Sequence, residues 1–102
     1  MKEVVLSHGS EAMLYLVPDP VAEQLDEHCS AFACHWLWES PHAERYRKMV
    51  NGIRCIVYGV PDFIEYLNTW VFPNQPSSLV QMLGCDCHEL PEQYKNFPQF
   101  NF

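Results

Sequence analysis

The chain has 102 residues, of which 48% are hydrophobic and 14% aromatic, and its formal net charge at pH 7 is −7. This length predicts a single domain over residues 1–102, and the apolar content predicts a packed core rather than a disordered chain. The negative charge disfavours nucleic acid as a partner, because the phosphate backbone is itself anionic.

The apolar residues are not arranged for secretion or for a membrane. The N-terminal segment has an apolar run of only three residues, 4–6, whereas a signal peptide needs about 7–15. No window approaches the roughly 18 apolar residues of a membrane helix. The five cysteines cannot all pair within one chain. We therefore expect a cytoplasmic protein with reduced thiols and no membrane partner.

The N-terminal residues predict a β-hairpin and then a long helix. Apolar runs at 4–6 and 12–17 flank a turn-like segment. A helix is predicted over 19–39, because Pro20 suits its first turn and Ser40 precedes a proline that disfavours helical geometry. Its apolar stripe consists of Val21, Leu25, Phe32 and Trp36.

A second hairpin is predicted around Asn51-Gly52. The flanking segments Arg45–Val50 and Ile53–Tyr58 have β-like composition. Asn-Gly supplies the two positive-φ residues of a tight turn, so this is the strongest local hairpin signal in the chain.

Two further helices are predicted before the C-terminus. The first covers about 62–72, because acids at its first and fourth positions have the spacing of a capping box. The second begins at Ser77 or Ser78 and ends at Gly84, since glycine commonly caps a helix C-terminus. Residues 85–102 show no period, and we expect an irregular tail that packs on the domain or on a partner.

The predicted order of elements is β-β-α-β-β-α-α. It indicates the α+β class, with a small antiparallel sheet and helices packed on one face of it. No Walker or dinucleotide-binding motif, nucleophile elbow or zincin helix occurs in the sequence. The enzyme classes that carry these motifs are therefore disfavoured.

A cluster of metal-ligand residues lies near the C-terminus. Cys85, Cys87 and His88 are of the types that zinc prefers, but they would need a fourth ligand. The candidates for that ligand are His8, His28, His35 and His42. The usual spacing of paired zinc cysteines is absent, so the same residues also fit a loop with two reduced thiols and a surface histidine. A zinc-binding domain is the first alternative function, and otherwise we expect no cofactor.

A small cysteine-dependent enzyme is the second alternative. Cys34 or Cys85 would serve as the nucleophile and a nearby histidine as the base. On the predicted long helix, however, His28-Cys29 and Cys34-His35 are also typical of half-buried histidines and a core cysteine at a packing boundary.

Trp38 and a cationic segment are candidates for a protein interface. Trp36 and Trp38 are about 200° apart on a helix, so they cannot both face one core. Trp38 would then be covered by the phenylalanines of the tail or by another molecule. Residues 45–54 carry four cations and no acid, whereas residues 1–44 carry eight acids and one lysine. The candidate interface residues are Trp38, Arg45, Arg47, Arg54, Phe100 and Phe102.

These features together predict a non-enzymatic protein-interaction or regulatory module. The cationic segment is typical of a solvated hairpin face, and its alternative role is to contact an acidic surface. That surface belongs either to another protein or to the acidic helix of a second copy. We therefore expect a protein partner or a homodimer.

Overall fold

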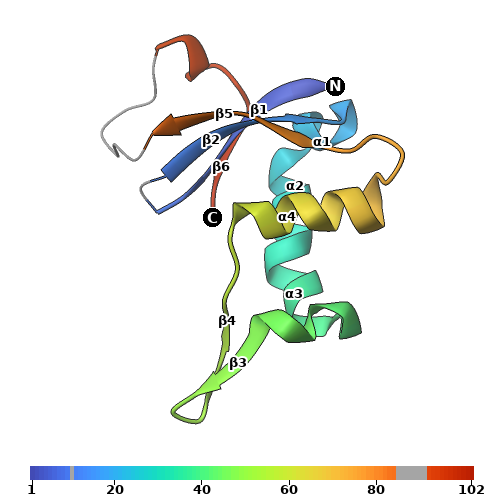
Figure 1. Cartoon of the computed structure of the whole chain (residues 1–102), viewed down its shortest axis with the longest axis vertical. Coiled ribbons are helices and arrows are strands. Elements are labelled where there is room, and N and C mark those ends of the chain that lie inside the picture. The colour runs from blue at the N-terminus through green and yellow to red at the C-terminus, as the bar shows by residue number, and fades with distance from the viewer. Residues whose placement is uncertain (10, 85–91) are drawn as a thin grey trace.

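The computed structural model of the chain describes residues 1–9, 11–84 and 92–102 (Figure 1). Its strands are β1 (Lys2–His8), β2 (Glu11–Val17), β3 (Arg47–Val50), β4 (Ile53–Ile56), β5 (Ser78–Gly84) and β6 (Gln99–Asn101). Its α-helices are α1 (Asp19–Glu23), α2 (Leu25–Ser30), α3 (Leu37–Glu39) and α4 (Val60–Tyr66). The π-helical turns are η1 (Ala31–Trp36) and η3 (Leu67–Val71), and the 3-10 helices are η2 (Pro41–Tyr46) and η4 (Glu92–Tyr94). The predicted α+β class is confirmed.

The N-terminal hairpin forms as the sequence predicts and becomes the centre of a four-stranded sheet in the order β5-β2-β1-β6. β1 and β2 pair antiparallel from Lys2 with Val17 to His8 with Glu11. Because side chains alternate along a strand, the two faces of the sheet serve different clusters. Val4 and Leu6 face the main core with the helices, whereas Val5 packs with Tyr94 in a smaller cluster on the other face.

The helix predicted over 19–39 is present, but it is not continuous. Gln24 has φ −127° and ψ 48°, and this break separates α1 from α2. After α2 the helical run continues through η1 into α3. It ends at Ser40, whose backbone is extended ahead of Pro41. Phe32 is fully buried and lies at the centre of an aromatic core, with Phe63 and Tyr66 of α4 among its neighbours.

Two predictions for the C-terminal third were wrong. Residues 78–84 form strand β5, which pairs antiparallel with β2, rather than a third helix. A short apolar run fits either structure, and here β2 supplies the backbone partners that favour a strand. The tail is not irregular throughout either, because β6 pairs parallel with β1 and makes the sheet mixed rather than purely antiparallel. Residues 85–91 lie outside the part of the chain that the structure describes.

The second hairpin also forms as predicted, but it stands apart from the sheet. Asn51 and Gly52 have φ values of 52° and 80°, as a tight turn of this type requires. β3 and β4 pair with each other in a separate two-stranded sheet. In Figure 1 this hairpin projects from one end of the molecule along its longest axis. The radius of gyration, 14.1 Å, accordingly exceeds the roughly 13 Å expected for a compact domain of this length.

Among the described residues, every helix is too short or too polar to span a lipid bilayer.

Candidate protein-interaction surface

Two arginines attach the projecting hairpin to the end of the long helix. Arg47 donates from Nε to the carbonyl oxygen of Leu37 at 2.8 Å and from its guanidinium to that of Ser40. Arg54 donates to the carbonyl oxygen of Trp38 at 2.9 Å. The last carbonyls of a helix have no partner within the helix and carry partial negative charge, so cationic donors are favourable there. The hairpin is therefore a positioned element rather than a loose loop.

Trp38 lies beneath Arg54 and remains 40% exposed. The guanidinium carbon of Arg54 is 5.5 Å from the centre of the Trp38 ring, which is within the range of a cation–π contact. The tail phenylalanines lie elsewhere: Phe100 and Phe102 pack against the main core, and Phe97 packs with the smaller cluster around Val5. Of the two alternatives for Trp38, cover by these phenylalanines is therefore not the one observed.

Phe100 and Phe102, two of the candidate interface residues, pack against the main core. Both are partly buried there, and their rings are 4.9 Å apart. Phe102 also lies 5.4 Å from Phe63 and 5.9 Å from Tyr58. These contacts connect β6 to the helices, so both side chains have a structural role whatever else they contact.

Arg45 differs from the other candidate arginines because it already has a carboxylate partner. Its guanidinium bonds the carboxylate of Glu65 at 2.9 Å and the hydroxyl of Tyr46 at 2.6 Å. These hydrogen bonds, first that of Glu65, raise the pKa of Arg45 above its usual range. Arg45 thereby joins η2 to α4. No ion pair involves Arg47, Lys48 or Arg54 in the described part of the chain.

The two faces of the hairpin have different roles. Directly opposed residues of an antiparallel pair share a face, so Arg47 and Arg54 lie on one face, which is anchored to the helix. The other face carries no anchoring contact among the described residues. We call it the open face. It consists of Lys48, Val50, Ile53 and Cys55, together with Val57, which extends β4 by one backbone hydrogen bond to Tyr46 and alternates onto the same face. Its isoleucine and two valines are 66%, 51% and 58% exposed. Contiguous exposed apolar side chains of this kind are typical of a contact surface.

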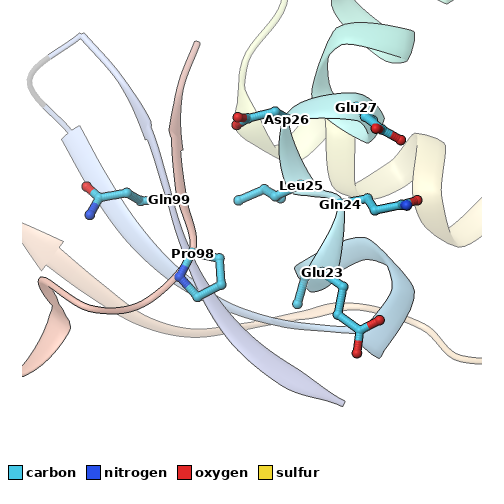
Figure 2. A pocket seen from close by; sticks show the side chains of 8 residues that line it. Glu23, Gln24, Leu25, Asp26, Glu27, Pro98 and Gln99 are labelled. Atoms are coloured by element: carbon cyan, nitrogen blue, oxygen red, sulfur yellow. The ribbon is translucent and has the colours of Figure 1, made fainter.

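A groove of about 380 Å³ lies near the opposite end of the long helix, between the α1–α2 junction and β6 (Figure 2). Its lining includes Ala22 and Leu25 from the helices and Pro98 and Gln99 from the tail segment. Figure 2 shows Leu25 and Asp26 pointing toward β6, whereas Gln24 and Glu27 point away. The sequence did not predict this groove, because neither the break at Gln24 nor β6 was foreseen.

The cysteines that the structure describes do not form a recognisable reactive centre. Burial, and secondly the charge of Asp26, raises the pKa of the Cys29 thiol to about 12. Cys34 is exposed, and the thiol of Cys55 donates to the carbonyl oxygen of Ile53 at 3.7 Å. No hydrogen bond joins a cysteine to a histidine within residues 1–9, 11–84 and 92–102. Cys34, the proposed nucleophile at this position, therefore has no histidine hydrogen-bonded to it within those residues.

The metal site suggested by the sequence falls on residues that the structure leaves out. Cys85, Cys87 and His88 all lie outside the described residues. Among the residues that are described, no group of three histidine, cysteine or acidic side chains is placed to hold a metal ion. Comparison of the chain with protein-family models, with curated proteins and with solved structures found no match in any of the three.

Proposed function

We propose that the chain is a non-enzymatic protein-interaction module that associates with a second copy of itself through the β3–β4 hairpin. The observation that supports this most strongly is the open face, where Ile53 and Val57 are each more than half exposed. An isolated two-stranded ribbon is at most marginally stable in water, and here only one face of the ribbon is held, by the end of the helix. A second molecule packed on the open face would remove these side chains from water and supply that layer.

Burial of the open face supplies enough free energy for a reversible contact. Fully burying a valine or isoleucine side chain contributes about 1.5–3 kcal/mol. Since half or more of Val50, Ile53 and Val57 is exposed, their coverage contributes on the order of 3 kcal/mol in total. The entropy lost on association opposes this gain, so apolar burial alone gives a weak complex and polar contacts must add to it.

The anchoring of the hairpin favours association because the hairpin is already ordered before it binds. Arg47 and Arg54 hold the ribbon against the end of the helix before any partner arrives. A segment that is already in its bound conformation loses less entropy on binding than a flexible one.

Sedimentation equilibrium of the whole chain tests this proposal with a matched pair of variants. Ile53 and Met49 are 66% and 68% exposed and occupy opposite faces of the same hairpin. We expect the natural chain to show an average mass above 11.9 kDa that rises with concentration. Ile53→Gln should weaken self-association about tenfold, which corresponds to about 1.4 kcal/mol, whereas Met49→Gln should leave it nearly unchanged.

Two outcomes would refute self-association through the hairpin. The first is a mass of 11.9 kDa at every concentration up to about 1 mM. The free energy of self-association would then be less favourable than about 4 kcal/mol. The second is self-association that Ile53→Gln and Met49→Gln weaken equally. Circular dichroism of both variants is the control that checks whether each retains the fold.

A further inference from the structure

The chain also carries a surface to which the hairpin of a second copy can bind. We infer that the hairpin of one copy docks in the groove between the α1–α2 junction and β6 of the next copy, so that the molecules join head to tail. This inference rests on the proposed function and identifies the partner surface within it.

Charge favours this arrangement over contact between two hairpins. Residues 45–61 contain four cations and no acid, although the chain as a whole has a net charge of −7. Lys48 belongs to the open face, so packing two open faces together would bring two lysines close to one another. Like charges at a contact are unfavourable and opposite charges select the partner. The hairpin therefore fits an acidic surface better than a copy of itself.

The groove offers that acidic surface together with an apolar floor. Asp26 points along the groove toward β6, and no ion pair holds it within the described residues (Figure 2). Ala22, Leu25 and Pro98 supply apolar atoms beside it. The hairpin tip has the matching pattern, with Val50 and Ile53 beside Lys48.

The placement of the two surfaces makes the contact intermolecular. The hairpin is fixed to residues 37–40, and the groove adjoins Gln24, more than a dozen residues earlier on the same run of helix. At 1.5 Å per residue the two lie roughly 20 Å apart along the helix, so one molecule cannot fill its own groove. A contact between two different surfaces leaves one hairpin and one groove unused in each dimer. Such a contact extends into longer assemblies unless a ring closes.

Mixing two defective variants tests the head-to-tail arrangement. Ile53→Asp blocks the hairpin and leaves the groove intact, whereas Asp26→Lys blocks the groove and leaves the hairpin intact. We expect each variant alone to sediment as a monomer of about 11.9 kDa. An equimolar mixture should form a dimer of twice that mass and nothing larger, because only one competent hairpin and one competent groove remain. Glu11→Lys makes the same charge change on an exposed acid outside the groove and should associate like the natural chain.

The outcomes separate this inference from the proposed function. If Asp26→Lys alone still associates like the natural chain while Ile53→Asp does not, the hairpin is an interface but the groove is not the surface to which it binds. If each variant alone is monomeric and their mixture is monomeric too, head-to-tail docking is also refuted. If the natural chain itself is monomeric, self-association fails as a whole. High salt should weaken the mixed dimer, because screening reduces the attraction between Lys48 and Asp26.

Discussion

Replacing Arg47 tests whether the hairpin is held by the end of the helix. Arg47 is partly buried and donates to two backbone carbonyls, those of Leu37 and Ser40. Hydrogen bonds from a charged donor contribute about 1.5–3 kcal/mol each, so Arg47→Ala should lower the free energy of opening the hairpin by about 3 kcal/mol. Arg54→Ala removes one exposed hydrogen bond and the contact with the Trp38 ring, and should cost about 1 kcal/mol.

Amide hydrogen exchange measures this difference directly. A loss of 3 kcal/mol corresponds to exchange about 100-fold faster, and it should be confined to the amides of β3, β4 and Val57. Arg47→Lys should recover only part of the protection, because an ammonium cannot reproduce the planar fork of the guanidinium. Equal exchange rates in Arg47→Ala, Arg54→Ala and the natural chain would show that these bonds do not hold the hairpin.

Three further predictions concern the core and the turn. The pKa of Cys29 is raised from 9.0 to about 12 by burial, so the folded state holds a proton that the unfolded state loses. The contribution of this thiol to the free energy of unfolding should be fully present below pH 9 and fall as the pH rises toward 12. Urea unfolding should therefore give a lower free energy at pH 10 than at pH 8, and Cys29→Ala should make that difference smaller. Phe32→Ala should cost about 3–5 kcal/mol in urea unfolding, because Phe32 is fully buried among other rings, and a loss under about 1 kcal/mol would contradict this. Gly52→Ala should cost about 1 kcal/mol in thermal unfolding, since φ is +80° and no atom lies within 4 Å of the added carbon; an unchanged melting temperature would contradict that strain.

The local parts of the fold were predictable from the sequence because their signals lie in neighbouring residues. Asn51-Gly52 specifies its turn by backbone conformation alone, and Ser40-Pro41 ends the long helix in the same way. The strand over 78–84 was mistaken for a helix because its identity depends on pairing with β2, more than 60 residues earlier. The parallel pairing of β6 with β1 connects the two ends of the chain and leaves no local pattern.

The candidate interface was predicted in part, and its meaning changed once the hairpin was placed. The sequence identified Trp38, Arg47 and Arg54 as unusual, and the structure shows that they form one contact at the end of the helix. The open face escaped notice because Val50 and Ile53 appear in sequence as ordinary strand residues of a sheet. Only the separation of the hairpin from that sheet exposes them.

Concentration-dependent NMR spectra test most directly whether the open face mediates self-association. On dilution from high to low concentration, the methyl signals of Val50, Ile53 and Val57 should shift together, while that of Met49 on the anchored face of the same hairpin should stay nearly constant. Methyl signals of the open face that do not change with concentration, or shifts confined to other exposed side chains such as Leu79 and Met82, would contradict the account.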